Sequence, residues 1–68
     1  MQNQNLLFTI PESAAALRIS RSTIYRLISS GDIETITVRG LQRIRPIALE
    51  RFVEKQQRAQ RQRAVNFS

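Results

Sequence analysis

One face of a predicted helix over residues 21–30 combines a phenol, hydroxyls and guanidiniums. Ser20 is suited to cap the start of this helix, because its hydroxyl can accept a hydrogen bond from an otherwise unpaired amide. Gly31 is suited to end it, since glycine adopts the left-handed conformation without a Cβ clash. At about 100° per residue, Ile24, Leu27 and Ile28 fall on the side to be buried. The opposite side presents groups that can hydrogen-bond base edges and phosphates of nucleic acid, from Arg21, Ser22, Tyr25, Arg26, Ser29 and Ser30.

The composition disfavours catalysis and metal binding. The chain has no cysteine and no histidine, which removes thiolate and imidazole ligands and the usual general base near neutral pH. Glu50 and Glu54 are four residues apart, but in a basic exposed helix they are expected to form salt bridges rather than to act as a catalytic acid/base pair. The two glycines, Gly31 and Gly40, do not form a phosphate-binding loop. We therefore predict a protein that is not an enzyme, with no catalytic residue, no metal site and no cofactor.

The charge balance favours a polyanionic partner. Eleven Lys and Arg residues against five Asp and Glu give a formal charge of +6, and ten of the eleven cations are arginine. Arginine presents a planar fork that matches phosphates and base edges, which lysine lacks. Such an excess is typical of nucleic-acid-binding domains. The alternative is a charged surface that only keeps the chain soluble.

A shorter helix is predicted ahead of this one. Thr9 and Glu12 have the spacing of a capping box, and the helix that they start runs to about Arg18. Residues 18–20 then form a connection of the length found at a helix-turn-helix corner. The apolar residues 6–8, before the first helix, form either a brief strand or a cover on the core.

A hairpin is predicted after the second helix. The alternation of Ile36 and Val38 with polar residues indicates a half-buried strand. The turn falls at Arg39-Gly40 or at Gly40-Leu41, and the returning strand points Ile44 inward. Packed on the helices, this two-stranded ribbon would form a wing, with Arg39, Gly40, Arg43 and Arg45 at its tip and outer face.

Pro46 is favourably placed to open a last helix, whose apolar stripe ends at Val53. The predicted fold class is therefore a winged helix-turn-helix, mainly α with a small β-hairpin. We expect a disordered lead-in over residues 1–5, a domain over 6–55, and a polar, basic extension over 56–68 that is helical or disordered. No run is long enough for a membrane helix and the N-terminus does not resemble a signal peptide, so a cytoplasmic protein is expected. The predicted core is Ile10, Leu17, Ile24, Leu27, Ile28, Ile36, Val38, Ile44, Leu49, Phe52 and Val53.

The order of elements, with the residues Ile19-Ser20-Arg21-Ser22-Thr23-Ile24-Tyr25-Arg26-Leu27-Ile28-Ser29-Ser30-Gly31, resembles the small excisionase-like winged-helix proteins related to the MerR DNA-binding domain. The resemblance covers roughly residues 8–54. It is most specific over residues 20–32, which are followed by Thr37-Val38-Arg39-Gly40 and Arg43-Ile44-Arg45. The small size, with no effector domain attached, is similar to that of a phage or mobile-element excisionase, a recombination directionality factor.

This resemblance implies a protein that binds and bends attachment-site DNA and directs an integrase toward excision in a bacterial host cell. Residues 20–30 would enter the major groove, and residues 39–45 would lie in the minor groove or along the phosphates. Several copies would contact each other head to tail on the DNA, and no membrane is involved. The expected DNA contacts are Arg18, Ser20, Arg21, Ser22, Thr23, Tyr25, Arg26, Arg39, Gly40, Arg43 and Arg45.

Several alternatives remain open at the level of the sequence. Arg26 contacts either a base or a phosphate, and Arg18 is either a phosphate clamp or makes no contact. Tyr25 can instead lie on the hydrophobic boundary of the helix, and Thr23 can serve packing. The wing arginines can be ordinary edge-strand charges. For the whole chain, the alternatives are a winged-helix transcriptional regulator, and a protein-interaction or membrane-surface module that uses the basic last helix.

Overall fold

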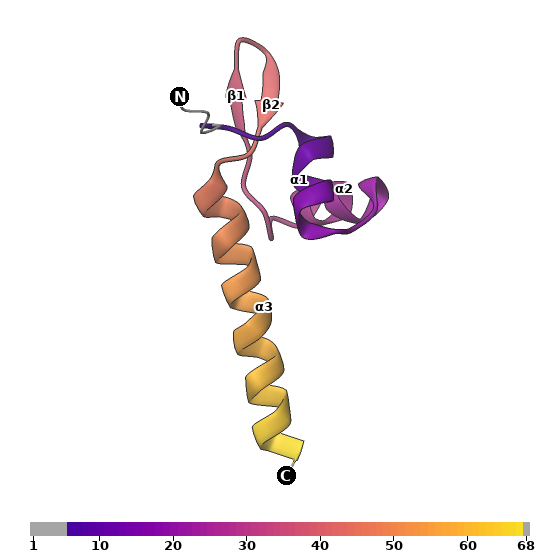
Figure 1. The fold of residues 1–68 in the computed structure, drawn as a ribbon, viewed down its shortest axis with the longest axis vertical. Helices are drawn as coiled ribbons and strands as arrows, with labels where there is room; N and C mark the ends of the chain where they lie inside the picture. Colours follow the sequence, from indigo (N-terminus) through magenta and orange to yellow (C-terminus); the bar gives the residue numbers. More distant parts are fainter. Residues whose placement is uncertain (1–5, 68) are drawn as a thin grey trace.

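Three helices and one hairpin build the fold (Figure 1). The structure, a computed structural model, describes residues 6–67, with side chains over residues 6–61; the lead-in predicted over residues 1–5 and the last residue, Ser68, lie outside this part. The elements are α1 (Ile10–Leu17), α2 (Arg21–Ser29), β1 (Ile36–Val38), β2 (Leu41–Arg43) and α3 (Pro46–Phe67). This order confirms the predicted fold class, a helix-turn-helix with a two-stranded hairpin ahead of a last helix.

α1 starts and ends through local hydrogen bonds. The Thr9 amide donates to Glu12 Oε1 at 2.9 Å, and the Glu12 amide donates to Thr9 Oγ1 at 3.1 Å, which completes the predicted capping box. The helix ends at Arg18, whose φ of +60° and ψ of +44° are left-handed. The amides of Arg18 and Ile19 donate to carbonyl groups of the last turn at 3.1 and 3.0 Å. The chain therefore turns sharply into the corner that precedes α2.

α2 is held at both ends by the residues that the sequence indicates. Ser20 Oγ accepts a hydrogen bond from the Thr23 amide at 3.1 Å. At the other end Gly31 has a φ of +86°. The amides of Gly31 and Asp32 donate to carbonyl groups of the last turn at 3.1 and 2.9 Å. These two bonds form a Schellman motif, which places glycine where a side chain would be strained.

The hairpin turns at Arg39-Gly40, the first of the two predicted positions. Both residues have positive φ, +53° and +81°, as expected for the primed turns that join two antiparallel strands. Phe8 extends the pairing at the base, because its amide and carbonyl group bond to Ile44 at 2.8 and 2.9 Å. The cross-strand pairs are Ile36 with Arg43, Thr37 with Gln42, and Val38 with Leu41.

The core lies where α1, α2 and the start of α3 meet the base of the hairpin. Its buried apolar residues are Ile10, Ala14, Ile24, Ile33, Ile44 and Leu49, and Phe8, Leu17, Ile19, Leu27, Ile28, Ala48 and Phe52 pack around them. The sequence did not point to Ile33, which is 2% exposed and lies in the loop between α2 and β1, outside any periodic pattern.

Three residues of the predicted core are exposed instead. Ile36 and Val38 are 36% and 40% exposed, because the hairpin extends beyond the helices and nothing in the described chain covers it. Val53 is 41% exposed, because α3 leaves the body of the molecule at this point. The predicted half-buried strand is therefore wrong in its burial, although its pairing is as expected.

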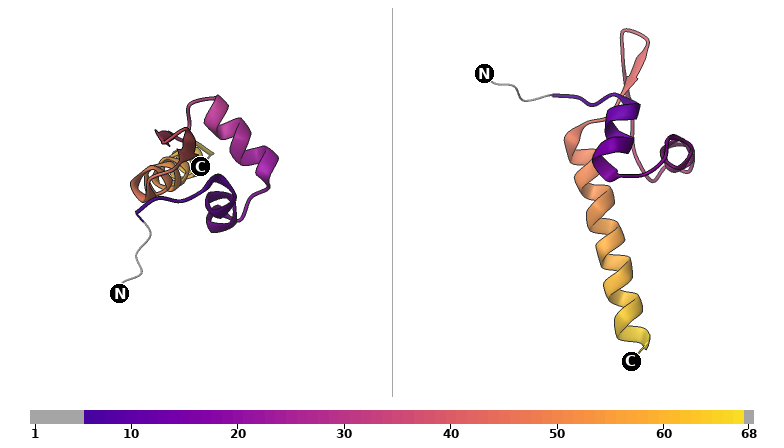
Figure 2. Two further views of the ribbon diagram at one scale, coloured as in Figure 1. Left: turned by 90° about the horizontal axis from the view of Figure 1, so that it is seen from above. Right: turned by 45° about the vertical axis from the view of Figure 1, so that its right-hand side comes forward.

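The molecule is elongated, with extents of 48 × 29 × 18 Å. α1 and α2 pack against each other on one side of α3 (Figure 2). The hairpin and the C-terminal end of α3 lie at opposite ends of the long axis (Figure 1). Within the described residues, no helix combines the length and the apolar character needed to cross a membrane.

Candidate nucleic-acid interface

α2 presents a continuous polar stripe to solvent. Ile24 is completely buried, and Leu27 and Ile28 are half-buried, which fixes the orientation of the helix. Tyr25 is 52% exposed, so about half of its side chain is open to solvent. The exposed side chains of α2 are Arg21, Ser22, Tyr25, Arg26 and Ser29.

Ser20 and Thr23 are engaged with the start of α2. Besides accepting from the Thr23 amide, Ser20 Oγ donates to Thr23 Oγ1 at 2.8 Å and lies 3.2 Å from Ser22 Oγ. Thr23 is half-buried. Both hydroxyls thus hold the N-terminal turn in shape, while Ser22 keeps an exposed position on the stripe.

Two arginines occupy left-handed backbone conformations. Arg18, in the corner before α2, has a φ of +60°, and Arg39, at the hairpin turn, has a φ of +53°. They are the only residues other than glycine with positive φ in the described chain. Such outliers in folded proteins cluster at functional sites. Both arginines are exposed.

The wing carries its arginines in different settings. Arg39 at the tip and Arg45 at the base are exposed, whereas Arg43 is half-buried and its Nη1 donates to the Gln42 carbonyl at 2.8 Å. Gly40 has open space around the position of a Cβ atom, so its φ of +81° and not a steric contact accounts for glycine there. Between Thr35 and Leu49 the sequence has no carboxylate.

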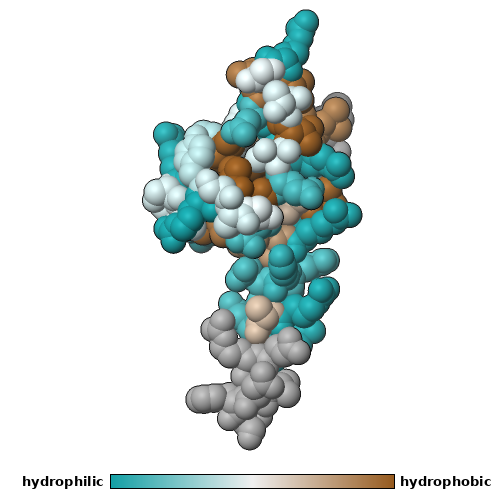
Figure 3. Space-filling view, turned by 180° about the vertical axis from the view of Figure 1, so that it is seen from behind, coloured by the Kyte–Doolittle hydropathy of each residue, from teal (hydrophilic) through white to brown (hydrophobic). Residues whose placement is uncertain are grey.

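α2 and the hairpin are both visible from one side of the molecule. Figure 3, seen from behind Figure 1, shows the polar side chains over α2 next to the hairpin, which bears apolar side chains below a polar tip. The arginines that lie in these elements or directly beside them in the sequence are Arg18, Arg21, Arg26, Arg39, Arg43 and Arg45. A cationic surface with a protruding helix stripe and a protruding ribbon suits the grooves and phosphates of a duplex.

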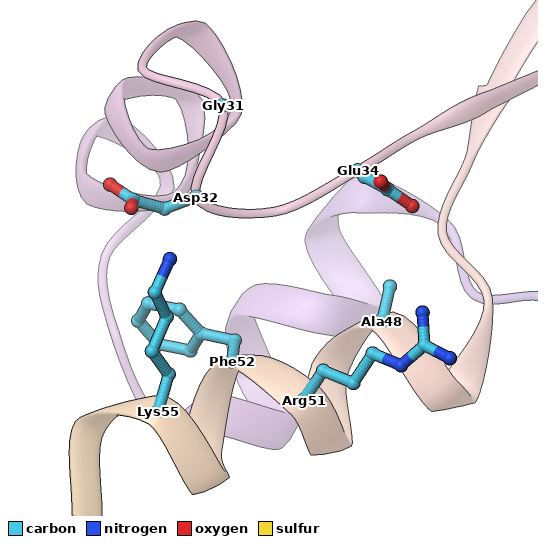
Figure 4. Close-up of a pocket in the computed structure, with 7 residues that line it drawn as sticks. All are labelled: Gly31, Asp32, Glu34, Ala48, Arg51, Phe52 and Lys55. Atoms are coloured by element: carbon cyan, nitrogen blue, oxygen red, sulfur yellow. The ribbon is translucent and has the colours of Figure 1, made fainter. Parts of the chain in front are cut away.

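A small cleft of about 190 Å³ lies between the loop after α2 and α3. Asp32 and Glu34 border it from the loop, and Arg51 and Lys55 from α3, with the Lys55 ammonium directed toward Asp32 (Figure 4). Facing charges of opposite sign favour close approach of the loop and α3. Among the described residues, no group of three or more His, Cys, Asp or Glu side chains is placed to hold a metal ion.

A tight corner, a capped second helix with an exposed polar stripe and an arginine-bearing hairpin together define a winged helix-turn-helix DNA-binding domain. A comparison with protein families agrees with this class. The model of the helix-turn-helix domain family matches residues 7–57, and the chain belongs to this family. Domains of this kind bind DNA and typically have no catalytic activity. No curated protein and no solved structure matches the sequence.

Proposed function

We propose that this protein is an excisionase-type accessory factor that binds and bends attachment-site DNA and directs an integrase toward excision. The observation that carries DNA binding is the exposure of both the α2 stripe and the arginine-bearing wing, which are visible from one side of the molecule (Figure 3). The accessory role is supported by the similarity of residues 19–31, and of the wing that follows, to excisionase-like proteins.

In this proposal α2 enters the major groove. Its N-terminal residues Arg21 and Ser22 and the next turn, with Tyr25 and Arg26, face base edges and flanking phosphates. Arg26 is assigned to base readout, because a bidentate arginine–guanine pair is the commonest specific contact. Ser20 and Thr23 contribute indirectly, because their hydrogen bonds stabilise the first turn of α2.

The wing follows the minor groove or its phosphates. The negative potential of a narrow minor groove favours arginine, and Arg39, Arg43 and Arg45 supply three guanidiniums without a neighbouring carboxylate. Gly40 lets the backbone of the tip approach the DNA closely. Arg18 is assigned to a phosphate beside α2.

One copy would bury only about 600–1,000 Å² of protein surface, which gives modest affinity. Several copies bound to neighbouring sites, in head-to-tail contact, would raise the occupancy of each site. The bends made by the individual copies would add up to a curved DNA path. The exposed part of α3 is available for contact with the integrase or with the next copy.

Footprinting on the attachment region of the host element tests the assignment. Arg26→Ala is expected to abolish a discrete footprint, because sequence readout is lost, whereas Arg43→Ala weakens binding uniformly. With about five to seven phosphate contacts, log K should fall against log salt with a slope of roughly −4.5 to −6. A slope near zero would rule out DNA binding of this kind.

A recombination assay separates the accessory role from its closest alternative, a transcriptional regulator of the same fold. Added protein is expected to stimulate excision by the cognate integrase. Specific DNA binding without any stimulation would reject the excisionase role and favour the regulator.

A further inference from the structure

The wing has an apolar face that is exposed along its whole length. Because cross-strand partners lie on the same side of a hairpin, Val38 and Leu41 share one face at the tip, and Ile36 continues it toward the base. These three side chains are 40%, 55% and 36% exposed. The opposite face carries the polar pair Thr37 and Gln42. The hairpin is therefore amphipathic, with its apolar side uncovered (Figure 3).

The surroundings of this face indicate what covers it. Arg39 lies between Val38 and Leu41 in the chain, and Arg43 lies on the same face as both. The nearest carboxylates in the sequence are those of Glu34 and Glu50. Within the hairpin, residues 36–43, the only charged side chains beside these aliphatic groups are guanidiniums, which match a surface that is apolar within and anionic at its rims. The minor groove, with sugar walls between two rows of phosphates, has this character.

The reach of the hairpin is also sufficient. Two three-residue strands project about 10 Å at roughly 3.3 Å per residue, and a minor groove is about 6 Å wide and 7.5 Å deep before it is opened. The turn is slender, since Gly40 has no side chain and nothing in the described chain lies within 4 Å of its Cβ position. Leu41 follows directly after this turn.

We propose that Leu41, supported by Val38, is an apolar wedge that enters the minor groove and partly unstacks one base step, so that the wing itself kinks the DNA. The inference rests on the proposed function, and it explains how the protein would bend DNA. Apolar wedges between base steps kink duplexes by about 20–90° toward the major groove. Arg39 and Arg43 would hold the phosphates on either side of the opened step.

The test uses the full chain and a duplex selected from a randomised pool by the wild-type protein. Bending is measured by circular-permutation electrophoresis, and unstacking by the fluorescence of 2-aminopurine placed at successive steps. Leu41→Ala is expected to lose most of the bend and of the fluorescence rise. It should bind about three- to tenfold more weakly, because the apolar contact is lost. Leu41→Met should retain both signals.

Gln42→Ala is the matched control, because it shortens the neighbouring side chain on the opposite face of the same strand. It should bend the duplex like the wild type. Thermal unfolding of each variant checks that the domain is intact.

The test distinguishes a failure of the wedge from a failure of the proposed function. If the wild-type chain selects no duplex, the proposed function fails together with the wedge. If Leu41→Ala binds, bends and unstacks like the wild type, the wedge alone is wrong. If Leu41→Ala changes only sedimentation of the free protein and leaves the bend intact, the apolar face joins copies of the chain and the wedge is again rejected.

Discussion

Arg18 and Arg39 occupy positions that glycine would occupy with less strain. A left-handed conformation costs a residue with a Cβ atom about 1 kcal/mol or more, and both arginines have φ values in this region. In a chain of 68 residues with a small core, such a cost is a large fraction of the stability. The presence of arginine at both positions in spite of this cost therefore favours a binding role for the two side chains, since they do not serve the stability of the fold.

Replacing Arg39 by glycine should have opposite effects on the stability of the domain and on its affinity for DNA. Arg39→Gly is expected to raise the free energy of unfolding by about 0.5–1 kcal/mol, because the strained backbone is relieved. It should also weaken DNA binding and reduce the magnitude of the salt slope by about 0.9, the share of one phosphate contact. Thermal unfolding and salt-dependent titration measure the two effects. Unchanged affinity and slope would show that Arg39 does not contact the DNA.

Ser20 gives a prediction for the fold alone. Ser20→Ala removes the acceptor for the Thr23 amide and should cost about 0.5–2 kcal/mol. Circular dichroism on heating would register this as a lower unfolding temperature. Ser22→Ala is the control, since Ser22 is exposed and its hydroxyl approaches only that of Ser20, at 3.2 Å. An equal loss in both variants would contradict the capping role.

The helix ends could be predicted because their signals are local. The capping box at Thr9 and Glu12, the cap at Ser20 and the stop at Gly31 each involve residues within one turn of the helix end. Each signal joins residues that are neighbours in the sequence, so it can be recognised without knowledge of the tertiary structure. The polar stripe of α2 was predictable for a similar reason, since burial of Ile24 fixes which side of the helix faces solvent.

Burial of the hairpin could not be predicted in this way. Alternation at Ile36 and Val38 shows only that one face is apolar, and whether a helix covers that face depends on the position of the strands in space. The same limit applies to Val53, whose periodicity continues past the point where α3 leaves the core. The apolar face that Leu41 shares with Val38 can be inferred only when the turn is known to be Arg39-Gly40, because this turn sets the register that pairs the two residues.

At the level of elements, Gly31 sets the junction between α2 and the loop that contributes Ile33 to the core. Gly31→Ala should cost about 1 kcal/mol, because φ is +86° and a side chain is strained there. The added Cβ would meet nothing within 4 Å, so the cost is one of backbone conformation. Chemical denaturation measures it, with the exposed Ser29→Ala as control. A neutral result for Gly31→Ala would mean that the junction can relax.

At the scale of the whole molecule, α2 and the hairpin lie apart from the C-terminal half of α3. The residues from 53 to 61 are all exposed, and Lys55 still borders the cleft beside Asp32. The hairpin lies at the other end of the long axis (Figure 1). The backbone of α3 nevertheless remains helical to Phe67. An isolated polar helix of this length is marginal in water, which favours a partner for it in the assembled complex.

Truncation after Gln57 should therefore leave a folded domain that still gives the discrete footprint expected of α2. The signal at 222 nm should fall with the lost helical turns, while the unfolding temperature changes little, since all of the described core residues are kept. The full-length chain with Arg58, Arg61 and Arg63 replaced by glutamine is the matched control, because it keeps the length and loses the charge. If binding is normal in the control and lost in the truncated chain, the helix itself contributes to the complex. A third outcome is that the truncated chain is folded but has no DNA affinity, and that the control has none either. In that case these arginines and not α2 are the primary DNA contact, and the major-groove assignment of Arg26 is wrong.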